Sequence, residues 1–218
     1  MFRNITNQKV VDFLDGFYSP ASEALSQLRN EAEENKVPIF SKDSESLILN
    51  LLRISKPKTL LEIGTAVGYS ACCMAEAVKD LNIVTVEKSD NMYNTALKNI
   101  EKLGFSDRIT ALNGDAAEVV NSLSKEEYSF DVVFIDAAKS HYKDFFDAAL
   151  PYCHSGTIII CDNMLFKARV VSDEYDPDRR HKTNIRKLRE FADYLFSLDS
   201  MNSTFLSVGD GLTISVIK

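Results

Sequence analysis

The sequence predicts an α/β fold: a mostly parallel sheet that ends in an antiparallel hairpin and follows a set of N-terminal helices. Short apolar segments alternate with segments of helical periodicity, which is the pattern of repeated strand–helix units. Near the C-terminus, two further apolar segments, 204–208 and 212–216, flank the turn-forming glycines of residues 209–211. The parallel strands are expected at residues 60–63, 83–86, 109–112, 130–135 and 157–161.

Size and composition favour one domain. The chain has 218 residues, of which 45% are hydrophobic, enough for one domain with a substantial core. We find no internal repeat or low-complexity linker, so we expect a single domain over residues 1–218, with residues 1–55 forming accessory helices within it. The four cysteines lack the spacing and density of a disulfide scaffold. They are expected to be reduced and buried.

Charge and the N-terminal residues limit the classes of function. A net charge of -7 argues against a general nucleic-acid coat, because binding to the phosphate backbone depends on Lys and Arg. Any nucleic-acid contact must therefore use a local patch. The N-terminus carries Arg3, Asp12 and Asp15 and has no long apolar run. These features predict a cytoplasmic protein without a signal peptide or membrane span.

Three helices are expected before the first strand. Apolar residues recur at helical spacing over residues 4–17, and Ser19 followed by Pro20 is typical of a second helix start. Residues 37–40 form a short apolar linker. Either Ser41 or Asp43 can then cap a third helix.

The rest of the chain is organised around a glycine turn after the first strand. Gly64 and Gly68 allow a tight connection to a helix that begins near Ser70. The N-terminus of this helix offers free N–H groups and the positive end of the helix dipole to a ligand. The spacing Gly-x-x-x-Gly differs from the dinucleotide pattern Gly-x-Gly-x-x-Gly. Glu62 before the turn suits a ligand with a cationic, hydrogen-bond-donating end. A plain structural turn is the alternative.

Acidic residues end the second and third strands. Glu87 follows Gly68 by 87 − 68 = 19 residues, near the roughly 20-residue interval at which an acid meets a ribose hydroxyl. An ordinary strand-end acid is the alternative. The next helix is expected to begin with Asp90 as its N-cap and to end at Gly104. Asp115 can accept a hydrogen bond from an exocyclic amine such as that of adenine, or can cap a helix.

Asp136 and the pair Asp162-Asn163 each close an apolar strand. The separation of 162 − 136 = 26 residues allows one strand–helix–strand unit, so the three side chains can converge at one edge of the sheet. Their oxygen atoms are hard donors, which favours Mg²⁺ and leaves Ca²⁺ and Mn²⁺ open. Helix capping is the alternative for these residues.

The motifs together resemble a known family. Residues 61–70, 134–139, 162–163 and 209–211 are similar to the motifs of the cation-dependent O-methyltransferases, which include catechol and caffeoyl-CoA O-methyltransferases. They occur in the same order and span nearly the whole chain. The resemblance implies a Rossmann-like sheet of the S-adenosylmethionine-dependent methyltransferases, mostly parallel with an antiparallel C-terminal strand. It also suggests a homodimer, with the N-terminal helices as a contact.

The resemblance assigns roles to individual residues. S-adenosylmethionine is expected to contact Phe40, Ser70, Glu87, Asp115, Ala116 and Asp136, in addition to Glu62, Gly64 and Gly68 of the glycine turn. Asp136, Asp162 and Asn163 are expected to hold Mg²⁺. Lys139 and Asp136 are the expected catalytic residues. Lys139, three residues after Asp136, resembles the general base of the family, and a lysine beside a divalent cation can lose its proton more readily. A solvated surface lysine is the alternative.

A basic segment refines the resemblance. Residues 37–40, 162–167 and the run 179–189, which has no acid and is expected within a helix to about Leu198, most resemble bacterial tRNA 5-hydroxyuridine methyltransferases. The implied substrate is 5-hydroxyuridine at the wobble position of the tRNA anticodon. The alternatives are a small catechol-like phenol or a non-catalytic S-adenosylmethionine-binding regulatory protein. The residues expected to bind RNA are Lys167, Arg179, Arg180 and Lys182.

Overall fold

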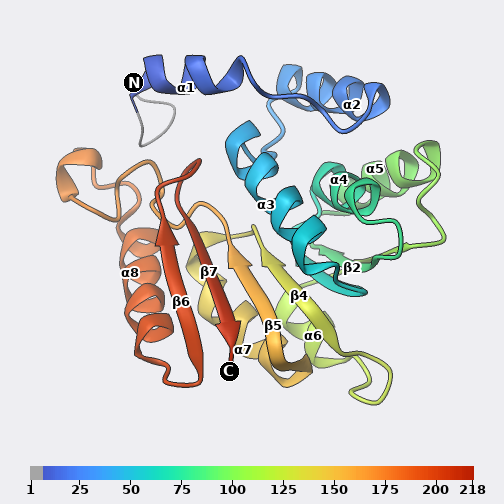
Figure 1. Ribbon diagram of the computed structural model, residues 1–218. Helices are drawn as coiled ribbons and strands as arrows, with labels where there is room; N and C mark the ends of the chain where they lie inside the picture. Colours follow the sequence, from blue (N-terminus) through green and yellow to red (C-terminus); the bar gives the residue numbers. More distant parts are fainter. Residues whose placement is uncertain (1–6) are drawn as a thin grey trace.

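The computed structural model describes residues 7–218, which form one seven-stranded sheet with helices on both faces (Figure 1). The strand order is β3-β2-β1-β4-β5-β7-β6. The strands are β1 (Thr59–Ile63), β2 (Asn82–Glu87), β3 (Ile109–Asn113), β4 (Phe130–Ile135), β5 (Cys153–Cys161), β6 (Met201–Leu206) and β7 (Leu212–Ile217).

The strand directions confirm the predicted fold class. Strands β1 to β5 pair in parallel, whereas β7 lies antiparallel to both β5 and β6. The last two strands form the expected hairpin, and β7 inserts between β5 and the edge strand β6. Because the first five strands are parallel, their carboxyl ends meet at one edge of the sheet, where open α/β sheets bind ligands.

Eight α-helices in residues 7–218 surround the sheet and lie on both of its faces (Figure 1). Their bounds are α1 (Gln8–Asp15), α2 (Glu23–Glu34), α3 (Lys42–Ser55), α4 (Tyr69–Ala77), α5 (Asp90–Lys102), α6 (Ala116–Asn121), α7 (Tyr142–Ala149) and α8 (Lys182–Ser197). Short 3-10 helices occur at η1 (Lys139–His141), η2 (Leu150–Tyr152) and η3 (Asp173–Tyr175).

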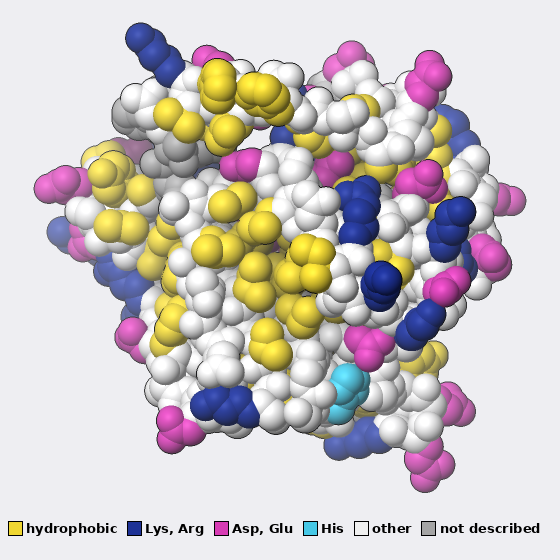
Figure 2. Space-filling view, viewed as in Figure 1, with side chains coloured by type: hydrophobic (Ala, Val, Ile, Leu, Met, Phe, Trp, Pro, Cys, Tyr) yellow, Lys and Arg dark blue, Asp and Glu magenta, His cyan; other side chains and the backbone are white. Residues whose placement is uncertain are grey.

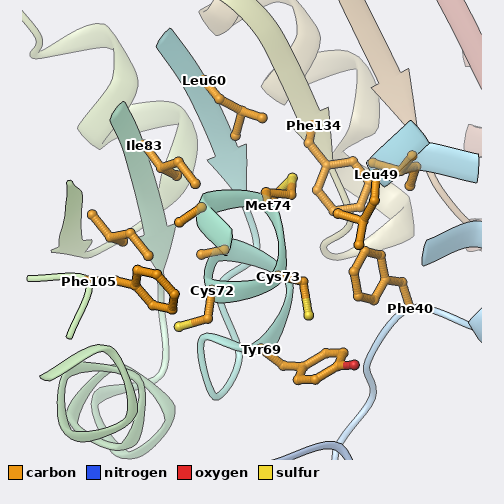
Figure 3. Close-up of a cluster of buried hydrophobic side chains, with 14 of the residues drawn as sticks. Phe40, Leu49, Leu60, Tyr69, Cys72, Cys73, Met74, Ile83, Phe105 and Phe134 are labelled. Carbon is orange, nitrogen blue, oxygen red and sulfur yellow. The ribbon is translucent and has the colours of Figure 1, made fainter. Parts of the chain in front are cut away.

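Alternating strand residues supply two apolar cores. Leu60 packs with α2 to α5, whereas Leu61 and Ile63 of the same strand pack with α6 to α8. Figure 3 shows Leu60, Ile83 and Phe134 directed toward α4 in the first core. All four cysteines are free, and three of them are buried. No helix in residues 7–218 is long and apolar enough to cross a membrane.

Several helix starts differ from the predictions. Helix α2 begins after Ser22, whose hydroxyl accepts the N–H of Leu25, and not after Ser19. Helix α5 is capped by Ser89, which makes Asp90 its first residue. Helix α3 begins after Ser41, one of the two caps expected. The first helix, predicted over residues 4–17, corresponds to α1, which ends at Asp15. Residues 4–6 of that prediction lie outside the described residues.

Candidate active site

A cavity of about 480 Å³ lies at the carboxyl ends of the parallel strands. The linker before α3 contributes Phe40 to one wall, and the segments that follow β1 to β5 supply the rest. Nine residues singled out in the sequence line it: Phe40, Gly64, Ser70, Glu87, Asp115, Ala116, Asp136, Lys139 and Asn163. Glu62, Gly68 and Asp162 do not line it.

The two glycines of the turn are required by neighbouring protein atoms. Gly64 has φ +103°, and a Cβ there would lie 2.2 Å from the carbonyl oxygen of Asp136. Gly68 has φ +81°, and its Cβ would lie 3.3 Å from the Cβ of Ala96 in α5. The tight connection expected from these glycines is therefore present, and Gly64 also lines the cavity. These glycines bring β1, β4 and α5 close together around the cavity.

Glu62 lies beneath the cavity. Its carboxylate is fully buried and accepts hydrogen bonds from the hydroxyls of Ser70 and Thr85, each at 2.5 Å. Burial raises the pKa of Glu62 to about 7. The carboxylate of Glu62 does not reach the cavity, where a direct contact with a cationic ligand was expected. Ser70, which lines the cavity, donates its hydroxyl to that carboxylate. Glu62 instead fixes the Ser70 hydroxyl at the cavity wall.

Glu87 and Asp115 hold the loops at the second side of the cavity. Glu87 accepts the N–H of Ala66 through Oε2 and the N–H of Ser89 through Oε1, both at 2.8 Å. Asp115 caps α6 by accepting the N–H of Ala117 and also pairs with Lys88 at 3.0 Å. The capping role considered for Asp115 is present, and the residue still faces the cavity.

Lys139 joins Asp136 to the end of β5. Its Nζ donates to Oδ1 of Asp136 at 3.1 Å and to the hydroxyl of Tyr142 at 3.0 Å. The Tyr142 hydroxyl in turn donates to the carbonyl oxygen of Asp162 at 2.7 Å. The side chain of Lys139 is only 15% exposed. Lys139 is therefore held inside the site and is not a solvated surface lysine.

The donor set fits a divalent cation. Oδ1 of Asp162 accepts the N–H of Asn163 at 2.6 Å, whereas the buried Oδ2 has no hydrogen-bond partner. An unsatisfied buried carboxylate oxygen is costly, and a cation satisfies it. Burial, followed by repulsion from Asp136, raises the pKa of Asp162 well above its ordinary value. No cluster of three or more His, Cys, Asp or Glu residues occurs over residues 7–218, so the set needs the amide of Asn163.

The tip of the C-terminal hairpin connects two walls of the site. The N–H of Gly209 donates to Asp43 at the start of α3 at 2.8 Å. The carbonyl oxygen of Asp210 accepts the N–H of Leu165 at 2.9 Å, and its carboxylate accepts the N–H of Lys167. Gly211 has φ +87°, and a Cβ there would lie 2.5 Å from Cγ of Leu165. The hairpin tip thus fixes the loop that carries Asn163.

The basic segment is less uniformly cationic than its sequence predicts. Arg179 and Arg180 lie before α8, not within it, and Arg180, Arg186 and Arg189 each pair with a carboxylate. Among residues 7–218, no carboxylate lies within 4.0 Å of the basic groups of Lys167, Arg179 or Lys182. A second cavity, of about 380 Å³, is lined by Asp173, Asp176, Arg179, Lys182, Ile185, Arg186 and Arg189.

A buried ion pair that was not predicted from the sequence lies next to Phe40 and Tyr69 of the first cavity. Arg29 in α2 is 4% exposed and pairs with Glu45 in α3, which is 1% exposed, at 2.6 Å. Both groups also contact the hydroxyl of Tyr69. A signal was present in the sequence: Arg29 shares the apolar stripe of Leu25, Leu28 and Ala32, where a charge is unexpected.

Comparisons with known proteins agree with the fold and the cavity. The family model for O-methyltransferases matches residues 17–218. A catechol O-methyltransferase from Niastella koreensis is 28% identical and covers 97% of this chain and all of its own length. A caffeoyl-CoA O-methyltransferase from Populus kitakamiensis is 31% identical over 90% of this chain and 87% of its own.

A similar solved structure contains S-adenosylhomocysteine. The Podospora anserina methyltransferase PaMTH1, solved with S-adenosylhomocysteine bound, superposes with a TM-score of 0.87 at 25% identity, covering all of this chain and 97% of that one. The family match covers most of the chain, and the topology and the cavity at the strand ends agree with it. The chain belongs to the O-methyltransferase family of the catechol and caffeoyl-CoA enzymes and is an S-adenosylmethionine-dependent O-methyltransferase.

Proposed function

We propose that this enzyme methylates the 5-hydroxyl of 5-hydroxyuridine at the wobble position of tRNA, giving 5-methoxyuridine. The observation that carries the proposal is the group of cations without carboxylate partners, Lys167, Arg179 and Lys182, in the segment that continues from Asn163 at the cavity. An RNA backbone gains from such cations, whereas a small neutral phenol does not. Arg179 and Lys182 also line the second cavity, between η3 and α8, which offers a recessed place for a phosphate.

In this proposal, S-adenosylmethionine occupies the first cavity. Glu87 at the end of β2 accepts from a ribose hydroxyl, and Asp115 with Ala116 faces the adenine. Ser70, fixed by Glu62, and the backbone of the glycine turn receive the amino-acid end. Phe40 covers the cofactor from the linker. Asp136 then lies between the cofactor and the transfer site.

The proposed metal is Mg²⁺, held by Asp136, Asp162 and Asn163. When bound, it supplies a template for two adjacent substrate oxygens and eases the loss of the hydroxyl proton. Both 5-hydroxyuridine, with its C4 carbonyl beside the hydroxyl, and a catechol offer two such oxygens. The metal residues therefore do not distinguish these substrates, and the discrimination rests on the cations outside the cavity.

Transfer itself needs alignment and removal of one proton. Neutral Lys139 accepts the proton of the substrate hydroxyl at Nζ, and the oxygen attacks the methyl carbon while the bond to sulfur breaks. S-adenosylhomocysteine is the other product. Tyr142 holds Nζ in place through its hydroxyl, at 3.0 Å. Alignment of this kind contributes up to roughly 7–11 kcal/mol in well-oriented reactions.

The competing substrate is a small catechol-like phenol. It is favoured by the names of the relatives, which act on catechol and caffeoyl-CoA, at 28% and 31% identity. The alternative from a different class, a non-catalytic binding protein, disagrees with membership of the O-methyltransferase family. The presence of Asp136, Lys139, Asp162 and Asn163 in one arrangement supports catalysis over that alternative, and turnover on any substrate excludes it.

Nucleoside mass spectrometry tests the tRNA substrate. Deletion of the gene is expected to remove 5-methoxyuridine and to leave 5-hydroxyuridine, and the purified protein should methylate such hypomodified tRNA. Arg179→Glu with Lys182→Glu should weaken tRNA binding and reduce its salt dependence, whereas Lys98→Glu, an exposed lysine on α5, should not. Unchanged 5-methoxyuridine together with methylation of a catechol by the purified enzyme contradicts the proposal.

We also propose that the active form is a homodimer in which α1 contacts a second copy of the chain. This helix has no buried residue, and Val10, Phe13, Leu14 and Phe17 are between 45% and 75% exposed. Figure 2 shows apolar side chains gathered along the upper edge of the molecule, where Figure 1 places α1. Light scattering should give a dimer for the native protein and a monomer for Phe13→Ser with Phe17→Ser. A native monomer contradicts this.

A further inference from the structure

The guanidinium of Arg29 joins four parts of the chain. Its Nη2 donates to the carboxylate of Glu45 in α3 at 2.6 Å and to the carbonyl oxygen of Phe40 in the linker at 3.0 Å. Its Nε donates to the hydroxyl of Tyr69 in α4 at 3.0 Å, and Nη1 donates to Glu33 of its own helix at 2.9 Å. One side chain thereby fixes the relative positions of α2, the linker, α3 and α4.

Two tyrosines complete this arrangement, which we call the Arg29 cluster: Tyr18, Arg29, Glu45, Tyr69 and the Phe40 carbonyl. The hydroxyls of Tyr18 and Tyr69 each donate to the Glu45 carboxylate at 2.8 Å. The guanidinium also lies 5.2 Å from the ring centre of Tyr18 and 5.0 Å from that of Tyr69. Both charges are thus paired and hydrogen-bonded within the cluster.

Two residues of the Arg29 cluster line the first cavity. Phe40 and Tyr69 both lie in its wall, and their rings meet edge to face with centres 5.7 Å apart. Figure 3 shows the two rings beside each other, with the Tyr69 hydroxyl directed toward the chain that carries Phe40. A shift of the Phe40 carbonyl or of the Tyr69 ring therefore changes the shape of the cavity.

Stability alone gives a poor account of this ion pair. A buried Arg–Glu pair loses hydration that its mutual attraction often fails to recover, and apolar residues of similar size are often as stabilising or more so. The cluster adjoins an apolar core that contains Leu25, Leu28 and Ile48. What the guanidinium supplies instead is a set of planar donors with fixed directions, which orient several acceptors at once.

We propose that Arg29 is a positioning residue for S-adenosylmethionine, which holds Phe40 and Tyr69 in the geometry that binds the cofactor. The inference rests on the proposed placement of the cofactor in the first cavity. Arg29 does not line that cavity and acts through its neighbours. Its loss is therefore expected to weaken cofactor binding and to leave the transfer step, which depends on Lys139 and Asp136, nearly unchanged.

The first test replaces Arg29 by lysine, which keeps the charge beside Glu45 but cannot reach all four acceptors. We expect the Kd for S-adenosylmethionine, measured by calorimetry, to rise about tenfold, while kcat at saturating cofactor stays within about twofold of the native value. An unchanged Kd for Arg29→Lys overturns the inference.

The second test separates positioning from stability. Arg29→Met combined with Glu45→Leu removes both charges, so that neither is left buried without its partner. Its free energy of unfolding should equal or exceed the native value, and the Kd for the cofactor should remain raised. If Kd returns to the native value in this variant, the ion pair is merely structural. If this variant does not fold, Arg29→Lys alone decides.

Arg108 provides a matched control. Its guanidinium also binds backbone, donating to the carbonyl oxygens of Ala75, Val78 and Lys79, but none of these four residues lines the cavity. Arg108→Met should lower stability without changing the Kd. Glu87→Ala tests the placement of the cofactor in the first cavity independently of Arg29. A raised Kd in Glu87→Ala with a native Kd in both Arg29 variants refutes the role of Arg29 alone, whereas native values in all of them refute the cavity placement.

Discussion

The Nζ of Lys139 lies 3.1 Å from Oδ1 of Asp136, so the proposed base and a proposed metal ligand form one ion pair. A cation bound by Asp136 competes with Lys139 for that carboxylate. In the proposed mechanism, metal binding therefore releases Lys139 from its ion pair with Asp136.

Lys139→Met is expected to lower turnover about 100-fold or more and to change cofactor affinity by less than about twofold. The loss should shrink as the pH rises, because the substrate hydroxyl then ionises without the lysine. A pH–rate profile measures this. Lys143→Met, which removes an exposed lysine paired with Asp147, should keep the native profile. Near-normal turnover in Lys139→Met would assign the proton transfer to another group.

Asp162→Ala should largely abolish methyl transfer while leaving S-adenosylmethionine binding mostly intact, because Asp162 does not line the cavity. Calorimetry and activity assays on the same preparation measure the two effects. Asp162→Asn keeps an acceptor for the N–H of Asn163 and serves as the control for folding. Full turnover by the native enzyme after thorough chelation and without added metal contradicts the metal role.

Glu87→Ala is expected to weaken S-adenosylmethionine binding about tenfold or more, because a ribose hydroxyl loses a charged acceptor and the N–H groups of Ala66 and Ser89 lose theirs. Glu101→Ala, which removes an exposed acid from α5, is the control. Titration calorimetry gives both values. Equal affinity in the two variants would refute the ribose assignment.

Gly211→Ala should destabilise the protein more than Gly156→Ala. Both glycines have φ near +90°, so each substitution costs about 1–2 kcal/mol in backbone strain. At Gly156 no atom lies within 4 Å of the new Cβ, whereas at Gly211 Cγ of Leu165 lies 2.5 Å from it. We expect about 1–3 kcal/mol of further loss at Gly211. Urea denaturation measures the difference, and equal losses would show that the hairpin tip accommodates the methyl group.

Glu62→Gln should change how stability depends on pH. Burial raises the pKa of Glu62 from 4.5 to about 7, so between these values the folded state binds more protons than the unfolded state. The contribution of this group to stability is therefore present at low pH and is lost as the pH rises to about 7. Glutamine has no proton to lose. Compared with the native protein, the variant should gain stability between pH 5 and pH 8; parallel curves from urea denaturation would exclude the assignment.

The sequence by itself determined the order of the elements and nine of the residues that line the first cavity. Apolar runs and helical periodicity are local properties, so they predicted the parallel strands and the C-terminal hairpin. Residues that end parallel strands must meet at one edge of the sheet. For that reason Asp136, Asp162 and Asn163 could be assigned to one site from the sequence, whereas the cofactor roles of Glu87 and Asp115 rested on spacing and on the resemblance to the family.

Only the tertiary structure decided which groups pair with which. The direction of Glu62 into the protein, the partner of Arg29 and the contacts of Gly211 depend on segments far apart in the sequence. The same holds for the basic segment, since Arg189 is neutralised by Asp173, 16 residues before it. Hydrogen bonds and ion pairs need atoms within about 3–4 Å, and sequence spacing fixes such distances only within one element.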